Sequence, residues 1–329
     1  MTGPAILLTG AGGFIGSAVL AALRDRPGAG PVRALARSAA PPGTVRVAAD
    51  LADPATLRGA AEGADVLVHL AAAVSGDEES CAAVNVHGTR ALLAEAARAG
   101  VGRIVHLSTT AVYGPGPHRG IDVDAVAPAP VSAASRTRLT GERAALDAGA
   151  VVLRAPLVLG AGDRWVVPCL AELTRRVPAR WDGGAARLSL VAVEDLARLV
   201  AGLAVGPAPA PGGVHHAGHP EPVRGGALLD TLAEHGVLAP TPGPDWSWEQ
   251  CVAELRRVPG VFSERQFALL AQDHWYRSAE IWQLADVDPG PGPLHRLAAA
   301  APWYREHLAR IGAPATEQSS GRVAKAASG

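Results

Sequence analysis

The sequence predicts an α/β fold in which a doubly wound parallel sheet is followed by a smaller, mainly helical C-terminal region. Short apolar runs alternate with helical patterns up to about residue 160, as in parallel sheets covered by helices on both faces. The first run, residues 5–8, leads directly into TGAGGFIG at residues 9–16 and then into a helical pattern. Beyond residue 160 this alternation stops, and five of the seven Trp lie between Trp246 and Trp303.

The glycine-rich turn predicts a ligand-binding site at the edge of this sheet. A strand, a glycine turn and a helix in that order are typical of a Rossmann-type dinucleotide site. Gly10 permits the tight turn, Gly13 lets the backbone approach a pyrophosphate, and Gly16 lets the helix pack closely on the strand. The free N–H groups of the helix that begins near Phe14 and Ile15 would hold the phosphates.

The remaining elements follow from local pattern. Strands are predicted at 32–36, 45–49, 65–70, 103–107, 151–160 and 187–191. Helices are predicted at 82–99, 134–148, 169–176, 247–257 and 263–273, and two more are predicted to begin at 54 and at 193. We therefore expect an NADP-binding domain at 1–160 and a substrate-binding or cap region at 161–312, of which 185–205 return to the first domain. The small and polar residues of 313–329 predict a disordered tail.

The second strand ends at the position that faces the adenosine ribose in such folds. An acidic side chain there binds a free 2′-hydroxyl, whereas arginine accommodates a 2′-phosphate. Arg37 and Ser38 occupy this position with no acid nearby, which favours NADPH/NADP+ over NAD. Further cofactor contacts are expected where the third and fourth strands end, at Asp50, Leu51, Leu70, Ala71 and Ala72.

Hydroxyl groups gather where the fifth strand ends. Ser108, Thr109, Thr110 and Tyr113 arrive together at the carboxyl edge of the sheet, where ligands of open α/β sheets bind. Asn85, the only Asn, either braces the backbone between adjacent strands or is a solvated helix residue.

Composition excludes several classes of partner. The net charge is −1 and no basic run is present, which argues against nucleic acid and anionic membranes. No apolar stretch approaches the roughly 18 residues needed to span a bilayer, and the chain enters its first strand without a signal peptide, so we expect a cytoplasmic monomer or homodimer. The isolated cysteines and scattered histidines predict no metal site, and His215-His216 is interpreted as part of a loop.

With these motifs assembled, residues 5–205 resemble the extended short-chain dehydrogenase/reductases, the family of nucleotide-sugar epimerases and dehydratases. The resemblance rests on TGAGGFIG, Asp50-Leu51, His69-Leu70-Ala71-Ala72, Ser108-Thr109-x-x-Val112-Tyr113-Gly114, Leu153-Arg154-x-Pro156 and Val193-Glu194-Asp195-Leu196. It implies that Thr109, assisted by Ser108, orients a substrate carbonyl, and that Pro156 and Val158 flank the nicotinamide.

The chain departs from this family at its acid/base pair. The family motif is Tyr-x-x-x-Lys, but the only lysine here is Lys325, in the predicted tail. Alignment on Glu142 puts Ala134 in place of the tyrosine and Arg138 in place of the lysine; a shifted alignment gives Ser132 and Arg136, and we prefer the first. Arg138 would hold the nicotinamide ribose, but its high pKa prevents it from acting as the acid.

Three explanations of the missing tyrosine remain open: a non-catalytic NADP binder, a proton relayed from water by Ser108 or Thr109, or a proton supplied by the substrate. In its missing acid/base pair, in Gly162-Asp163-Arg164-Trp165 and in its Trp-rich C-terminal region, the chain is similar to atypical ketoreductases of angucyclinone biosynthesis. This resemblance implies NADPH-dependent reduction of an aromatic polyketide ketone. Sugar-nucleotide reduction or epimerisation and redox sensing are the alternatives. Candidate substrate contacts are Thr110, Tyr113, Arg164, Trp165, Trp246 and Trp275; the Trp-rich region either packs as core or caps an apolar substrate.

Overall fold

The computed structural model describes residues 3–206, 210–241 and 243–312. Its centre is a parallel sheet of seven strands in the order β12-β7-β5-β4-β1-β2-β3. These strands are β1 (Ile6–Thr9), β2 (Val32–Ala36), β3 (Val45–Ala48), β4 (Val66–His69), β5 (Arg103–Thr109), β7 (Val151–Ala155) and β12 (Gly213–His216). The strand order reverses between β1 and β4, so the predicted doubly wound fold is confirmed. The predicted tail, 313–329, lies outside the described residues.

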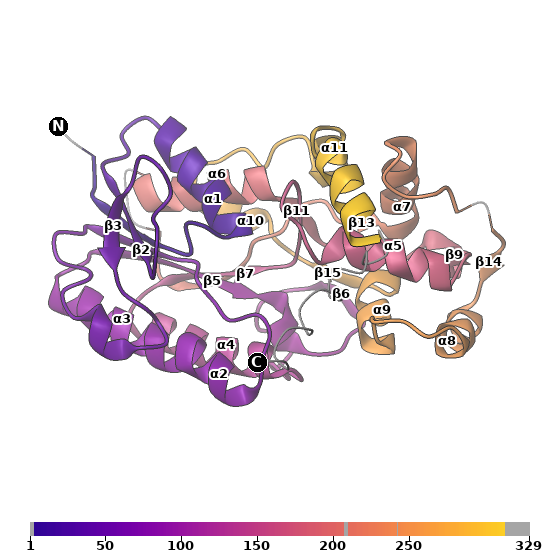
Figure 1. The fold of residues 1–329 in the computed structure, drawn as a ribbon, viewed down its shortest axis with the longest axis horizontal. Helices are drawn as coiled ribbons and strands as arrows, with labels where there is room; N and C mark the ends of the chain where they lie inside the picture. The colour runs from indigo at the N-terminus through magenta and orange to yellow at the C-terminus, as the bar shows by residue number, and fades with distance from the viewer. Residues whose placement is uncertain (1–2, 207–209, 242, 313–329) are drawn as a thin grey trace, which may run out of the picture.

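Helices cover both faces of this sheet (Figure 1). One face carries α1 (Phe14–Asp25), α6 (Val193–Val205) and α10 (Ala279–Leu284). The other carries α3 (Thr89–Arg98) and α4 (Ala133–Asp147), with α2 (Glu78–Ala82) and the π-helical turn η2 (Ala83–Gly88) beside α4. Because both faces are covered, β1 and β4 are buried along their whole length, which explains their continuous apolar runs.

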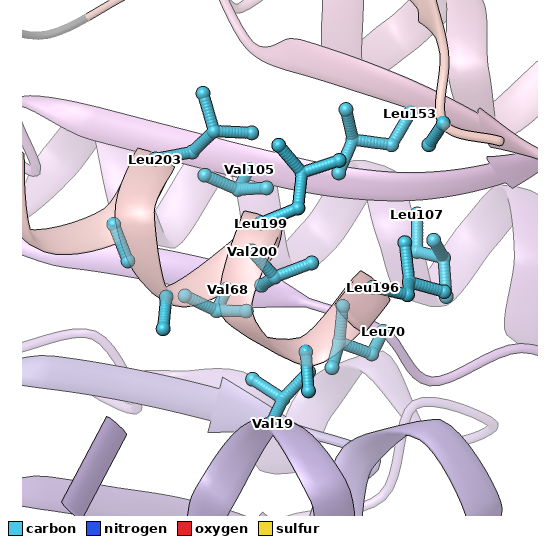
Figure 2. Packing of buried hydrophobic residues seen from close by; sticks show 14 of the residues in the cluster. Val19, Val68, Leu70, Val105, Leu107, Leu153, Leu196, Leu199, Val200 and Leu203 are labelled. Carbon is cyan, nitrogen blue, oxygen red and sulfur yellow. The ribbon is translucent and has the colours of Figure 1, made fainter. Parts of the chain in front are cut away.

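The core between the sheet and α6 joins distant parts of the chain. Figure 2 shows Leu196, Leu199, Val200 and Leu203 of α6 against side chains of three strands and against Val19 of α1. Beyond residue 160, α6, α10 and β12 thus complete the sheet and its helical layer. The prediction that His215 and His216 lie in a loop is wrong, because both belong to β12, which pairs in parallel with β7.

The C-terminal region packs around a second core. It contains α5 (Val166–Arg176), α7 (Gly225–Glu234), α8 (Trp248–Arg257), α9 (Glu264–Ala271) and α11 (Pro293–Gly312). The predicted helices at 247–257 and 263–273 are confirmed, and each begins with a capping box, from Ser247 and Ser263. Phe267 is fully buried, stacked on Trp248 at 5.3 Å between ring centres, so these aromatics pack as core.

Short strands connect the two regions. One small sheet has the order β13-β10-β15-β6, built from β6 (His118–Ile121), β10 (Arg187–Leu188), β13 (Val223–Arg224) and β15 (His274–Tyr276). Two pairs add β8 (Leu157–Leu159) with β11 (Leu190–Ala192), and β9 (Arg180–Trp181) with β14 (Asp245–Trp246). The predicted strand 151–160 is two strands, β7 and β8, separated at Pro156, which cannot donate to a ladder. The predicted strand 187–191 is likewise divided between β10 and β11.

Membrane-spanning helices and metal sites are two features that the sequence does not predict. Within 3–206, 210–241 and 243–312, no helix is long and apolar enough to cross a membrane. The same residues contain no cluster of three or more His, Cys, Asp or Glu side chains able to hold a metal. Cys81, Cys169 and Cys251 are buried free thiols.

Two histidines are buried side by side in the main sheet. His69 of β4 is in register with His106 of β5, and their ring centres lie 5.0 Å apart. His69 Nδ1 is 2.8 Å from Thr9 Oγ1, and its Nε2 is 3.0 Å from Thr89 Oγ1. Burial lowers the pKa of His69 from 6.5 to about 4 and that of His106 well below 6.5. Both rings are therefore neutral in the folded protein near neutral pH.

This burial predicts a loss of stability in mild acid. The unfolded chain takes up a proton on His69 as the pH falls through 6.5, whereas the folded chain does so only near pH 4. The contribution of His69 is therefore present above pH 6.5 and lost between 6.5 and 4, and amounts to about 3 kcal/mol. Urea unfolding between pH 7.5 and 4 measures it. A His69→Asn variant should show a shallower fall than the unmodified protein, and an equal fall in both would contradict the assignment.

Candidate active site

The glycine turn has the geometry that a dinucleotide requires. Gly10 has φ +75°, and a Cβ there would lie 2.9 Å from the backbone nitrogen of Ala71. A Cβ on Gly16 would lie 1.9 Å from the carbonyl oxygen of Gly10, so only glycine lets the helix approach the turn this closely. Gly13 is the N-cap of α1 with extended backbone, and its N–H donates to Gly10 O at 2.9 Å.

The first turn of α1 is open to an anion. No side chain caps α1, and its first turn contains no acidic residue. A Cβ added to Gly12 would meet no atom within 4 Å, whereas one on Gly162, beyond β8, would lie 2.8 Å from the Phe14 ring. The loop that contains Gly162 thus packs on the start of α1. These features fit a pyrophosphate held by the N–H groups of Phe14, Ile15 and their neighbours.

The residues expected to meet the adenosine differ in exposure. Arg37 and Ser38 follow β2 and are exposed to solvent. Asp50 accepts a hydrogen bond from Ala52 N on Oδ1 at 3.0 Å, and Leu51 is buried. Asp53 caps the helical turn η1 (Pro54–Leu57) by accepting from Ala55 N.

A polar brace fixes the segment that follows β4. The N–H groups of Leu70 and Ala71 donate to Thr9 Oγ1 at 3.2 and 3.1 Å. Ala72 is half-buried beside them. Asn85 Oδ1 accepts a hydrogen bond from Ala73 N at 2.8 Å, and Asn85 Nδ2 donates to Ala73 O and to Thr137 Oγ1. Of the two interpretations of Asn85, a backbone brace is therefore confirmed, but it joins this segment to α4 and not two adjacent strands.

The start of α4 distinguishes the two alignments of the missing acid/base pair. Ser132 is the N-cap of α4, and Arg136 is half-exposed and paired with Glu78 at 2.6 Å. Arg138 lies against the sheet, where Nη2 donates to Leu107 O at 2.9 Å, and burial lowers its pKa to about 10. The geometry therefore favours the alignment that places Ala134 and Arg138 at the family positions.

The two candidate hydroxyls of β5 differ in environment. Thr109 is half-buried and caps the turn η3 (Thr110–Tyr113), because its Oγ1 accepts from Ala111 N at 3.1 Å. Ser108 is 1% exposed and donates to Glu142 Oε2 at 2.5 Å. The expected contact between Ser108 and a ketone finds no support in this geometry, since its proton is committed to a buried carboxylate. Thr109 is therefore better placed than Ser108 to contact a ketone.

Ser108 belongs to a buried network that sequence analysis missed. Glu142 of α4 forms an ion pair with Arg154 of β7, with 2.6 Å between Oε1 and Nη2. Arg154 Nη1 donates to the Tyr113 hydroxyl at 2.7 Å, and this hydroxyl is also 2.7 Å from His216 Nε2. Most of these residues lie in the motifs, but no local signal shows that five separate elements, β5, η3, α4, β7 and β12, bring them together.

Tyr113 was expected to contact substrate, but the structure contradicts this. Only 2% of Tyr113 is exposed, and besides its contacts to Arg154 and His216 it donates to Val123 O at 2.9 Å. Its ring stacks on Tyr276 with 5.7 Å between ring centres. Burial raises the pKa of both phenols. Tyr304 is also fully buried, its hydroxyl between Gly160 N and the Asp163 carboxylate.

The other predicted substrate contacts are dispersed. Thr110 is half-buried at the start of η3. Arg164 is exposed and Trp165 packs on the second core; both follow Asp163, whose carboxylate caps the start of α5. Trp275 packs under Arg187, with 4.0 Å from guanidinium carbon to ring centre. Trp246 lies in β14, at the outer end of the C-terminal region (Figure 1), so it is not brought to the end of β5.

Replacing Tyr113 by phenylalanine should therefore affect stability rather than chemistry. The change leaves Arg154 Nη1 and His216 Nε2 without their partner, which costs about 1–3 kcal/mol of unfolding free energy. Turnover per folded molecule should stay within about twofold of the unmodified rate, because the hydroxyl does not reach substrate. Chemical denaturation and steady-state rates measure the two effects. A variant that folds and binds NADPH but is inactive would contradict this placement.

Together, the fold and the glycine turn define a dinucleotide-binding protein of the extended short-chain dehydrogenase/reductase type. Residues 6–211 match the model of the NAD dependent epimerase/dehydratase family, so the chain belongs to that family. Its members are NAD(P)-dependent oxidoreductases and epimerases, and we class the chain as an enzyme of this kind.

Individual relatives are more distant. The chain is 33% identical over 186 residues to a 2-alkyl-3-oxoalkanoate reductase of Stenotrophomonas maltophilia; the match spans 52% of this chain and 56% of that protein. A short-chain dehydrogenase/reductase superfamily protein from Agrobacterium tumefaciens with bound NAD superposes with a TM-score of 0.71 at 25% identity, covering 94% and 99% of the two chains. UDP-glucose 4-epimerase of Thermotoga maritima shares the fold alone, with a TM-score of 0.71 at 17% identity over 92% and 99%.

Proposed function

We propose that the protein is an NADPH-dependent ketoreductase whose substrate is an aromatic polyketide of the angucyclinone type. The observation that supports this most directly is the absence of an available tyrosine. Ala134 stands at the family position of the acid. Tyr113, Tyr276 and Tyr304 are all buried, and the hydroxyls of Tyr113 and Tyr304 are hydrogen-bonded within the protein. No lysine is present in residues 3–312 to lower the pKa of a phenol.

A ketone flanked by a phenol would not need a tyrosine from the protein. The phenol donates an internal hydrogen bond to the carbonyl oxygen and stabilises the negative charge that develops there. Its proton moves to that oxygen as the alcohol forms, and water then reprotonates the phenolate. Angucyclinone-type polyketides offer this arrangement, whereas the carbonyl of a 4-keto sugar has no phenol beside it. The lost tyrosine therefore favours the aromatic substrate.

Each residue at this edge of the sheet has a simple role in the proposed reaction. NADPH, when bound at the glycine turn, supplies the hydride. We propose that Thr109 orients the ketone oxygen and that Thr110 lines the same edge. Arg138 holds the nicotinamide ribose and contributes positive charge, while Pro156 and Val158 flank the nicotinamide. The Glu142–Arg154 pair positions β5 by holding Ser108.

We further propose NADPH over NADH as the preferred cofactor. Arg37 is exposed at the end of β2, and neither Arg37 nor Ser38 is an acid that would bind a free 2′-hydroxyl. An arginine accommodates the 2′-phosphate instead, by charge-assisted hydrogen bonds.

Product mass tests the proposal. The protein is incubated with NADPH and either an angucyclinone ketone or a 4-keto sugar nucleotide. We expect the polyketide to gain two hydrogens and the sugar nucleotide to remain unchanged. Reduction of the sugar nucleotide alone would identify a sugar-nucleotide reductase. Tight NADPH binding without any product would identify a non-catalytic NADP binder.

A further inference from the structure

A second arginine, Arg46, belongs to the neighbouring edge strand β3, and its side chain reaches the end of β2. We propose that Arg46 of β3 and Arg37 together form a two-arginine clamp for the 2′-phosphate of NADPH. This inference rests on the NADPH preference proposed above and extends it to a residue that neither motif nor strand-end position singled out. It makes Arg46 a determinant of cofactor specificity.

The backbone register shows how Arg46 reaches this position. Arg46 is paired with Ala34, two residues before the end of β2. Its side chain runs along the strand to the carboxyl edge, where Nε donates to Ala36 O at 3.2 Å and Nη2 donates to Arg37 O. The guanidinium therefore lies against the backbone of the residue whose side chain is expected to meet the phosphate.

The two carbonyls leave most of this guanidinium unused. Arginine has five N–H donors in a fixed plane, and these contacts employ one on Nε and one on Nη2. The carbonyls thus fix the plane, while the other three donors remain for a ligand. A guanidinium oriented in advance loses less side-chain entropy on binding than one free in solvent.

The charge balance at this edge also favours an anion. Arg37 and Arg46 are both exposed, and neither forms an ion pair with a carboxylate within residues 3–206, 210–241 and 243–312. Two unneutralised positive charges therefore start from adjacent strands at one edge. A phosphate monoester near neutral pH carries close to two negative charges and accepts hydrogen bonds from several donors. A free 2′-hydroxyl offers no such charge, so the clamp discriminates between the two cofactors.

Binding measurements separate this role from a purely structural one. Dissociation constants for NADPH and NADH are measured by titration calorimetry on the full chain and on Arg46→Ala, Arg37→Ala and the double variant. Each single change should weaken NADPH about 10-fold or more and leave NADH within about twofold. The salt dependence of NADPH binding should become shallower in the same variants. Arg143→Ala is the matched control and should change neither constant, because Arg143 is an exposed arginine of α4 that forms no ion pair with another described residue.

The outcomes distinguish the clamp from the cofactor preference and from the reaction. If Arg46→Ala weakens NADPH and NADH equally, Arg46 only supports the end of β2 and the clamp is overturned. It is also overturned if Arg46→Ala retains the full preference of the unmodified protein. If the unmodified protein binds both cofactors equally, the NADPH preference fails and the clamp fails with it. Ketone reduction is measured separately and is not decided by these titrations. Arg46→Lys, which keeps the charge but not the planar fork, should bind NADPH with intermediate affinity.

Discussion

Replacing Arg154 by alanine is expected to lower the free energy of unfolding by about 3–5 kcal/mol. Arg154 and Glu142 are 6% and 1% exposed in their side chains, so removal of the arginine leaves a carboxylate in the interior without its counter-charge. Ser108 alone cannot replace the two N–H groups that Glu142 accepts. The Tyr113 hydroxyl loses a donor as well. Urea denaturation monitored by circular dichroism gives the difference.

Two further variants test the cause of this loss. Arg98→Ala removes an arginine whose partners Glu62 and Glu95 lie at the surface, and it should cost no more than about 1 kcal/mol. Combining Arg154→Met with Glu142→Leu removes both buried charges and should recover part of the stability lost by Arg154→Ala. If Arg154→Ala were no more harmful than Arg98→Ala, the pair would not be buried as the structure shows.

Replacing Gly13 by aspartate is expected to abolish dinucleotide binding without unfolding the protein. Gly13 has the extended backbone of an N-cap, which aspartate adopts readily, and α1 has no side-chain cap. Helix stability should therefore change by less than about 1 kcal/mol, even though the new Cβ would lie 3.3 Å from Gly10 O. The carboxylate would occupy the N–H groups expected to hold the pyrophosphate and would repel it, which should weaken NADPH at least about 100-fold.

Calorimetric titration and thermal unfolding of Gly13→Asp measure both effects. Gly12→Asp is the informative comparison, because its Cβ meets no protein atom within 4 Å and any loss of binding there comes from charge near the cofactor. Tight NADPH binding by a folded Gly13→Asp protein would show that the pyrophosphate does not lie at the start of α1.

The sequence predicted the first half of the fold well because its signals are local. The strands β1 and β4 are apolar runs, and the glycine turn is identified by its spacing together with the strand before it and the helix after it. By contrast, β6, β12 and β15 are three or four residues long and rich in histidine and other polar groups. Their partners lie far along the chain, as His118 pairs with His274, so no window of sequence contains the pattern that defines them.

The candidate site shows the same limit. The hydroxyl residues after β5 indicated the edge of the sheet at which a ligand would bind. Their residue types could not show which of these hydroxyls face that edge. Ser108 and Thr109 are adjacent and differ because alternate residues of a strand face opposite sides of the sheet. Ser108 meets Glu142 on α4, while Thr109 caps the next turn. Tyr113 lies in the interior because Arg154 and His216, from distant strands, surround its hydroxyl. Arg46 was missed because alternation in Val45-Arg46-Val47 indicates only an exposed side chain.

The central claim is that this protein reduces a ketone with a proton from the substrate's own phenol. The most direct test compares an angucyclinone ketone carrying a free neighbouring phenol with its methyl ether, using NADPH deuterated at C4 and mass analysis of the product. Gly13→Asp serves as the control for direct reaction of quinones with NADPH. We predict that the phenol substrate gains one deuterium and one hydrogen, and that the methyl ether reacts at least about 100-fold more slowly. Equal rates for the two substrates would contradict this mechanism and indicate that the proton comes from the protein or from water.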